Sequence, residues 1–400
     1  MFCEMEDGER SHDFDSIIND AEKPLYSGCT NYTRLSGVLK LFKLKAEHGM
    51  TDKNFTDRLT AFNDMLPKGN VLPTSTYQAK KMLCPMGLDA EKIHACPNDC
   101  VLFRNEYKDL RECPKCGEGR YKLSKDGFDD KDGPPKKVLW YLPILPRIKR
   151  LFGNAKDAKN MTWHANRNKK DEMIRHVADS PQWKCIDDKY PDFGKEARNL
   201  RLGLCTDGIN PFGNMSSQHS TWPMLMVIYN LPPWLCMKRK HITLSLLISG
   251  PRQPGNDIDV YLAPLIEDLK MLWDDGVSVF DAYRQESFTL RAMIYCTIND
   301  FPASGNLSGH TVKGYKACPI YDDATKATHL PKSKKLAYIH NRRFLPRTHP
   351  YRRLRKAFDG NTQHESAPIP LTGEQVYERV KDIKCVFGKP YKAADDQVCY

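Results

Sequence analysis

Residues Leu200–Gly208 have the sequence Leu-Arg-Leu-Gly-Leu-Cys-Thr-Asp-Gly, an apolar run that ends in an aspartate and a glycine. An apolar run of this length, bounded by turn residues, is typical of a buried strand. Patterns of the same kind downstream predict strands at 223–229 and 242–249, a helix at 257–273, and strands at 277–283 and 290–298. This arrangement of strands and a helix predicts a mixed α/β domain over residues 199–303.

Two aspartates directly follow predicted strands, Asp207 after the first and Asp300 after the last. Three neighbouring strands, a helix and a later strand that ends in an acid form the order expected of an RNase H-like fold. Because those two strand ends lie side by side in such a sheet, we expect the two carboxylates to share a divalent metal, Mg²⁺ or Mn²⁺. The alternatives are that Asp207 caps a turn and that Asp300 caps a loop. A second acid pair, Asp257 and Asp259, is interpreted as capping the helix that follows.

Four cysteines stand in two close pairs upstream of this domain: Cys96, Cys100, Cys113 and Cys116. Zinc prefers four soft ligands in a tetrahedron, and two thiolate pairs on facing turns supply them. Residues 84–123 are therefore predicted to form a zinc ribbon, and the zinc is expected to be structural because no position remains for water. The alternative is four scattered buried thiols, and Cys84 and His94 lie close enough to act as substitute ligands.

The charge balance favours a polyanionic partner, although an ordinary basic surface is the alternative. The 400 residues include 61 Lys and Arg against 50 Asp and Glu, a formal net charge of +11. Nine basic residues and no acid fall within 334–356, interleaved with aromatic residues. Phosphate contact with stacking is the functional interpretation, against a solvated basic face. It makes four arginines candidate DNA contacts: Arg342, Arg343, Arg352 and Arg353.

The sequence shows neither a secretory leader nor a membrane span. Residues 1–10 are acidic and polar, without the basic start and apolar run of a signal peptide. The most apolar stretch, 222–237, is too short and too interrupted by proline to cross a bilayer. The 14 cysteines are accordingly expected to be metal ligands and buried thiols in a reducing, intracellular compartment.

Seven ordered stretches add a more specific signal: His94–Cys100, Lys137–Pro143, Leu202–Gly213, Asn230–Cys236, Gly255–Pro264, Thr297–Ala303 and Arg342–Pro346. Together they resemble the plant CACTA (En/Spm-like) transposase family, and the likeness extends from about Leu25 to Val380. The resemblance implies metal-dependent cleavage and transfer of DNA strands, with Asp207 and Asp300 as the first and second catalytic acids. It further implies nuclear localisation and duplex DNA, both transposon ends and target, as the partner. An accessory transposon protein or self-association stays open.

The resemblance also predicts that a third catalytic acid is missing. The family has a further block beyond the position that corresponds to Tyr400, and the third acid is expected there. The RNase H-like core is therefore expected to be incomplete and catalytically impaired. Glu374 and Glu378, on a predicted helix, are the fallback candidates, with a solvated helix face as the alternative.

A second metal site is predicted in degenerate form. Cys318-Pro-Ile-Tyr321 stands where the resemblance predicts a Cys-x-x-Cys pair followed by histidines, and tyrosine is a poor zinc ligand. His340 likewise stands where a glycine is expected. The remaining candidate ligands are Cys318, His340 and His349, with His329 as a further possibility.

These signals divide the chain into a helical segment (1–80), a zinc ribbon (84–123), a linker and basic pre-core segment (124–198), the RNase H-like core (199–303), a degenerate Cys/His insertion (304–360) and a C-terminal segment (361–400). The leading hypothesis is a transposon-derived DNA transposase fragment. The alternative is a catalytically dead, zinc-containing DNA- or protein-binding remnant, and an unrelated nuclease or hydrolase is a third possibility.

Overall fold

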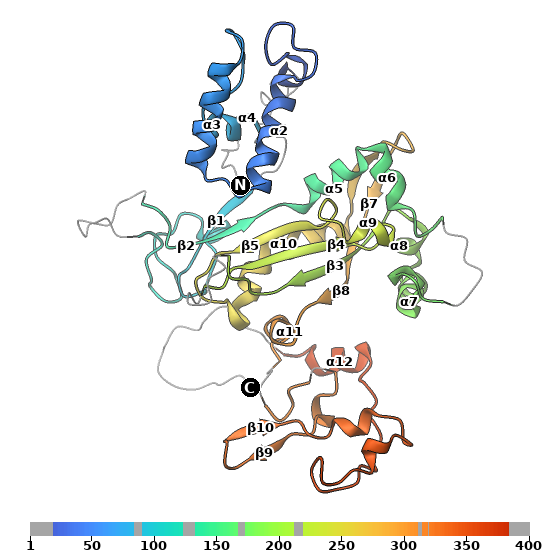
Figure 1. The fold of residues 1–400 in the computed structure, drawn as a ribbon. Coiled ribbons are helices and arrows are strands. Elements are labelled where there is room, and N and C mark those ends of the chain that lie inside the picture. Colours follow the sequence, from blue (N-terminus) through green and yellow to red (C-terminus); the bar gives the residue numbers. More distant parts are fainter. Residues whose placement is uncertain are drawn as a thin grey trace.

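The computed structural model of the chain describes residues 19–83, 90–122, 133–166, 173–211, 219–310, 314–318 and 320–383. Figure 1 shows three parts along the chain: a group of N-terminal helices, a central sheet with its helices, and a C-terminal part that contains a small hairpin. Within the described ranges, no helix combines the length and the hydropathy that crossing a membrane requires.

The described N-terminal part includes the helices α2 (Arg34–Glu47), α3 (Asp52–Met65) and α4 (Thr76–Leu83). The first two begin at threonines, because the side-chain oxygens of Thr33 and Thr51 accept hydrogen bonds from backbone N–H groups of the first turn. The helices pack around an apolar core that is separate from that of the sheet, with these members among others: Val38, Phe42, Phe55, Leu59 and Ala79.

The central sheet has six strands: β1 (Glu91–Ala95), β2 (Lys137–Tyr141), β3 (Leu200–Thr206), β4 (Trp222–Ile228), β5 (Thr243–Ile248) and β8 (Ala292–Ile298). Their order across the sheet is β1-β2-β5-β4-β3-β8. Neighbouring strands are antiparallel, except that β3 and β8 are parallel. It follows that β1, β5, β3 and β8 run in one direction. We call the end of the sheet where these four strands finish the carboxyl end, and the opposite one the amino end.

One long helix, α10 (Ile258–Asp274), connects the two ends of the sheet. It starts near the carboxyl end, because the short turn before it packs against α11 (Phe301–Ser308), which follows β8. The hairpin of β6 (Val277–Asp281) and β7 (Glu286–Leu290) then leads into β8 at the amino end. The buried side chains of α10 recur at helical spacing and join the core of the sheet: Ile258, Tyr261, Leu262, Leu265, Leu269 and Leu272.

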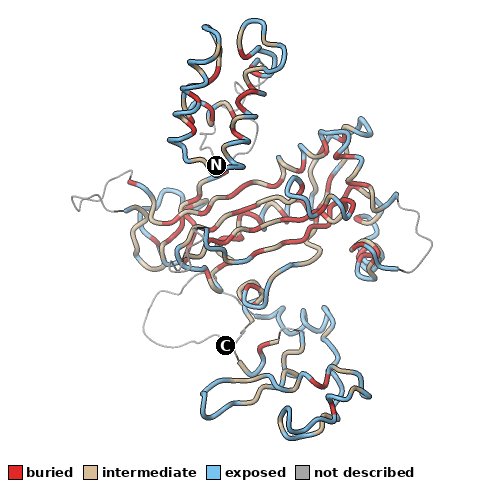
Figure 2. Tube along the Cα trace, in the orientation of Figure 1, coloured by how far each residue is buried: buried red, intermediate tan, exposed pale blue. Residues whose placement is uncertain are grey.

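The remaining elements are short: α5 (Ile144–Phe152), α6 (Ala155–Met161), α7 (Pro181–Lys189), α8 (Pro191–Lys195), α9 (Pro233–Cys236), β9 (Thr328–Leu330), β10 (Lys335–Ala337) and α12 (Gly373–Val380). Helices α5 and α6 contribute to the same core as α10. Figure 2 shows that buried residues follow the strands of the central sheet, whereas the C-terminal part is mostly exposed.

The mixed α/β class predicted from the sequence is confirmed, and so are the predicted strands that became β3, β4, β5 and β8. The sheet is wider than the predicted 199–303 segment, because β1 and β2 lie upstream of it. Strand β2 forms since Leu139 and Tyr141 alternate with less buried neighbours and enter the common core. Through β1, the cysteine-rich segment is joined to the central sheet, whereas its cysteines pack in a small apolar cluster of their own.

Candidate functional site

The four predicted zinc ligands come together in the structure. One ligand atom from each of Cys96, Cys100, Cys113 and Cys116 lies within 4.8 Å of all the others, and we call this group the cysteine cluster. The Sγ atoms of Cys96 and Cys116 are 3.5 Å apart. Zinc–sulfur bonds of about 2.3 Å in a tetrahedron place sulfurs about 3.8 Å apart, so the cluster fits a zinc ion with little movement.

Local backbone geometry aims these thiols at one point. Asp99, within the first pair, and Gly117, after the second, adopt left-handed conformations with φ of 63° and 71°. Glycine and aspartate tolerate that region better than most residues, which permits the tight turns. The backbone N–H of Asn98 donates to the Cys96 sulfur at 3.3 Å, a contact that stabilises a thiolate.

The thiols differ in their readiness to lose a proton. Burial raises the pKa of Cys96 to about 12 and, together with the neighbouring Cys96 charge, raises that of Cys100 as well. Burial also opposes ionisation of Cys116, but hydrogen bonds from the Asn98 side chain and from the Glu118 backbone outweigh it and lower that pKa to about 7. A metal that binds here must therefore displace protons from buried thiols.

A buried polar triad fixes the cysteine cluster to the sheet and to α10. Asp99 accepts hydrogen bonds from the ammonium of Lys137, at the start of β2, and from the hydroxyl of Tyr261 in α10. All three residues are buried. Arg104 adds a bidentate ion pair to Glu267 of α10, with N–O distances of 2.9 and 2.6 Å. The sequence does not predict these contacts, because nothing local to Asp99 indicates its distant partners.

The cluster and the predicted acids lie at the same end of the sheet. Cys96 directly follows β1, Asp207 follows β3 and Asp300 follows shortly after β8, and these three strands all end at the carboxyl end. In the parallel pair, Cys205 stands opposite Ile298, so each aspartate comes two residues after this last paired position.

The contacts around the two aspartates also match the alternative interpretations. Asp207 Oδ1 accepts a hydrogen bond from the backbone N–H of Gly208 at 2.7 Å, and Asp300 Oδ1 accepts one from Ala303 at 2.9 Å, where it caps α11. Both residues are exposed. In both residues the accepting atom is Oδ1. The other carboxylate oxygen, Oδ2, accepts no hydrogen bond from a described residue. Asn299, which no sequence pattern indicated, links the strands because its Oδ1 accepts a hydrogen bond from the backbone N–H of Thr206 at 3.2 Å.

The second acid pair differs from its predicted role. Asp257 occupies the N-cap position of α10, but its side chain makes no capping hydrogen bond to the helix. Asp259, in the first turn, is half-buried, and burial followed by the charge of Asp257 raises its pKa. The fallback acids Glu374 and Glu378 lie on α12 and are exposed, and Glu378 pairs with Lys381.

The predicted second metal site is not assembled. In the described part of the chain, the cysteine cluster is the one group of three or more His, Cys, Asp or Glu side chains whose ligand atoms gather closely enough for a metal. Cys318, His340 and His349 are therefore not brought together. The ring of His349 instead caps a turn, because its Nδ1 accepts from the backbone N–H of Tyr351 at 3.2 Å.

The structure corrects the DNA-contact prediction for three of the four arginines, since Arg342, Arg343 and Arg352 are buried. Their guanidinium groups donate to backbone carbonyls within the C-terminal part. The donor–acceptor pairs with the shortest separations are Arg342 to Leu354 (2.7 Å), Arg343 to Ala324 (2.6 Å), and Arg352 to Arg343 (2.7 Å) and Glu365 (2.8 Å). Among the described residues beyond α11, Ala317 is the one buried apolar residue, so buried arginines take the place of an apolar core. Arg353 is exposed, and its contact with DNA stays a prediction.

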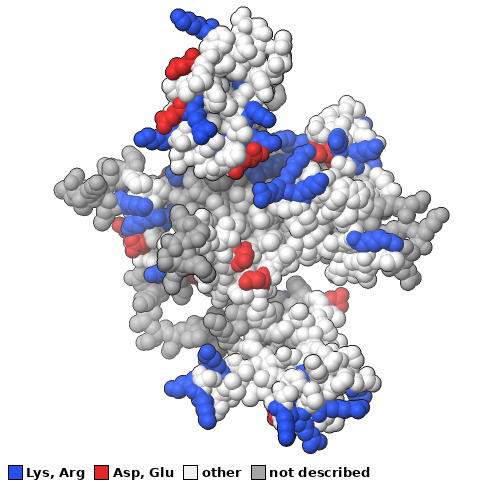
Figure 3. Space-filling view, in the orientation of Figure 1, with Lys and Arg blue, Asp and Glu red and all other residues white. Residues whose placement is uncertain are grey.

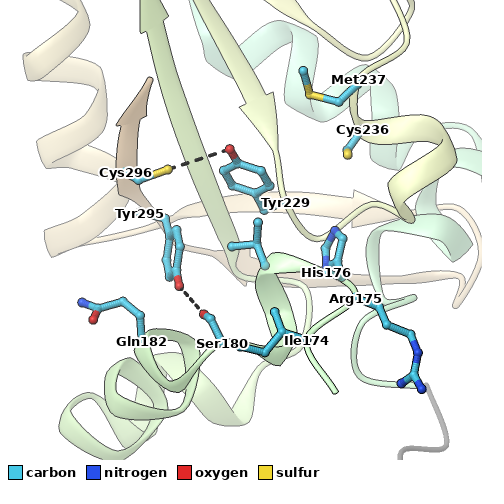
Figure 4. A pocket seen from close by; sticks show the side chains of 11 residues that line it. Ile174, Arg175, His176, Ser180, Gln182, Tyr229, Cys236, Met237, Tyr295 and Cys296 are labelled. Carbon is cyan, nitrogen blue, oxygen red and sulfur yellow. Dashed lines mark hydrogen bonds between the residues drawn. The ribbon is translucent and has the colours of Figure 1, made fainter. Parts of the chain in front are cut away.

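A cavity of about 800 Å³ opens beside β8. In Figure 4, the rings of Tyr229 and Tyr295 lie on one side of it and His176 lies on the other, with Ser180 next to Tyr295. The Tyr295 hydroxyl is 2.7 Å from the Ser180 hydroxyl. Neither predicted acid lines the cavity, so it is not part of the candidate catalytic end.

The fold and the candidate site together define a mixed α/β protein with a four-cysteine cluster that could hold a metal and two acids at the same end of one sheet. Residues 171–383, just over half of the chain, match the Transposase family tnp2, and the chain belongs to this family. The matched range includes both predicted acids and the C-terminal arginines, whereas the cysteine cluster lies before it. A comparison of the chain with curated proteins gave no match.

Proposed function

We propose that the chain is a DNA transposase of the CACTA type whose central sheet is an RNase H-like core. The observation that supports this most directly is the pairing of β3 and β8, the one parallel pair in the sheet, with Asp207 and Asp300 just beyond its end. The partial strand order β5-β4-β3-β8 agrees with the proposal. In it, β3, β4 and β5 pair antiparallel, and β8 pairs parallel to β3. Membership of a transposase family makes DNA the expected substrate.

In this proposal, Asp207 and Asp300 hold a divalent metal through the carboxylate oxygens that do not cap the following turns. Mg²⁺ or Mn²⁺ prefers such oxygen ligands and, when bound, supplies Lewis-acid activation of a phosphodiester. The capping hydrogen bonds from Gly208 and Ala303 orient the two carboxylates before a metal arrives. The exposure of both side chains leaves space for a DNA phosphate.

We further propose that Asp207 and Asp300 by themselves position a second divalent ion poorly. Two divalent ions have four positive charges, and two aspartates offset two of them. Without a third carboxylate, the second metal is weakly held, and small displacements of a reacting group reduce rates by orders of magnitude.

Zinc in the cysteine cluster has a structural role, because all four of its ligand positions come from the protein.

Manganese binding to the zinc-loaded protein tests the acid pair. We expect Asp207→Asn and Asp300→Asn each to weaken Mn²⁺ binding at least tenfold, measured by paramagnetic relaxation of water protons. The control, Asp275→Asn, alters an exposed aspartate just after α10 and should leave binding unchanged. Equal Mn²⁺ binding by all four proteins would refute the metal-site assignment. DNA binding that persists without any Mn²⁺ site would instead favour a zinc-containing, DNA-binding remnant.

A further inference from the structure

A second basic surface lies at the amino end of the sheet, away from the arginines that proved to be buried. Residues 144–161, which form α5 and α6, and residues 233–242, between β4 and β5, contain eight Lys and Arg and a single acid, Asp157. Seven of these basic residues are exposed, and we call them the basic ridge: Lys149, Arg150, Lys156, Lys159, Lys238, Arg239 and Lys240. Figure 3 shows Lys and Arg side chains gathered over α5 and α6.

Side-chain contacts hold the two segments of the ridge next to each other. Lys240 forms an ion pair with Asp157 of α6 at 2.9 Å, which joins the 238–240 turn to that helix. Arg147 of α5 donates to the carbonyl of Leu244 in β5 at 3.0 Å. The apolar sides of α5 and α6 enter the core, so their basic residues are left on the solvent side.

The acid of the ridge does not neutralise it. The side chain of Asp157 is 11% exposed and its carboxylate is occupied by Lys240, whose own side chain is 68% exposed. Seven cations and one carboxylate leave a net charge of +6 on the surface. An array of flexible, exposed Lys and Arg on two neighbouring segments fits a repeating polyanion better than a single small anion, because each side chain can contact a separate phosphate.

We propose that the basic ridge binds the backbone of duplex DNA that flanks the bond to be cut, an inference that rests on the proposed transposase function. The ridge is at the amino end of the sheet and the two aspartates are at the carboxyl end. The seven residues of β3 separate them by about 20 Å at 3.3 Å per residue. With one base pair per 3.4 Å, the ridge contacts phosphates about six base pairs from the acids.

Salt-dependent binding to duplexes of unrelated sequence tests the ridge. The ridge variant changes four residues to Gln: Lys149, Lys156, Lys238 and Arg239. Lys240 is kept, because its replacement would leave Asp157 without its ion-pair partner. The control variant removes the same charge from the exposed surface of the N-terminal part, with four residues changed to Gln: Lys40, Lys53, Arg58 and Lys68. Zinc content and thermal unfolding establish that both variants fold like the parent protein.

The ridge variant should weaken binding on the order of 10- to 100-fold near 0.15 M salt and reduce the salt slope by about 4, equally on every sequence. The control variant should change the affinity less than threefold. Equal losses in both variants, or a loss in the control alone, would overturn the ridge. If the parent protein fails to bind duplex DNA even at low salt, then the ridge and the proposed transposase function both fail. In contrast, DNA binding that the ridge variant retains in full, with Mn²⁺ binding intact, would refute the ridge alone.

Discussion

Replacing Arg352 by alanine tests whether the C-terminal part is held together by buried guanidinium groups. Arg352 is 4% exposed and makes four hydrogen bonds to backbone carbonyls, with distances between 2.7 and 3.3 Å. Hydrogen bonds to charged groups contribute about 1.5–3 kcal/mol each, but water enters the space that a truncated side chain leaves. We therefore expect a loss of about 3–5 kcal/mol, less than the sum over four such bonds, because water can reach the carbonyls that lose their donor.

The neighbouring Arg353 is exposed and provides the matched control, for which the expected change is within about 0.5 kcal/mol. Hydrogen exchange of the full chain, followed in peptides from 320–366, is the measurement. Arg352→Ala should accelerate exchange there about 100-fold or more, with the central sheet unaffected. Arg352→Lys should recover little of the loss, because an ammonium cannot reproduce the planar fork of donors. Identical protection in Arg352→Ala and Arg353→Ala, with DNA binding lost in Arg352→Ala alone, would refute the structural role.

Three further perturbations address the central sheet. Cys113→Ser should abolish the binding of one zinc ion in native mass spectrometry and expose the cysteine-rich segment to protease, whereas zinc that stays bound would rule out the four-cysteine site. Asp99→Asn should reduce the free energy of unfolding in urea by about 3–5 kcal/mol, because the ammonium of Lys137 stays buried without its counter-charge. A change below about 1 kcal/mol would contradict that reasoning. Gly203→Ala should lower the stability in thermal unfolding by about 1–3 kcal/mol, since the new Cβ would lie 2.7 Å from the ring of Tyr229. An unchanged melting temperature would mean that the ring of Tyr229 moves aside without cost.

Local patterns in the sequence were sufficient for much of the central sheet. The run at Leu200–Gly208 predicted β3 and the position of Asp207, because apolar periodicity and turn residues act over short distances. Cysteine spacing predicted the cluster for a similar reason, since four thiols in two turns have few other uses. Both signals are local, and they depend little on where the rest of the chain lies.

Long-range pairing was beyond the reach of these patterns. Residues 137–141 have an apolar pattern suited to a strand, but nothing local indicates that β2 pairs with both β1 and β5. The arginines misled the prediction for a different reason. Lys and Arg are mostly exposed in proteins, so a basic run predicts a surface. In a segment with few apolar residues, guanidinium groups such as that of Arg342 can instead satisfy several carbonyls at once, which only the folded chain reveals.

The direction of the strands explains why the cysteine cluster and the acids lie at the same end of the sheet, although β1 and β8 are its opposite edges. Because β1, β5, β3 and β8 run the same way, the cysteine cluster, the start of α10 and both aspartates all follow from strand ends at the carboxyl end. Asp99 then connects the cluster to α10 through Tyr261, so the helix that precedes β8 is held by the same turn that holds the thiols. Zinc in the cluster would consequently stabilise the end of the sheet where DNA chemistry is proposed. The basic ridge lies at the amino end, so DNA that contacts both the ridge and the acids would run along the length of the strands.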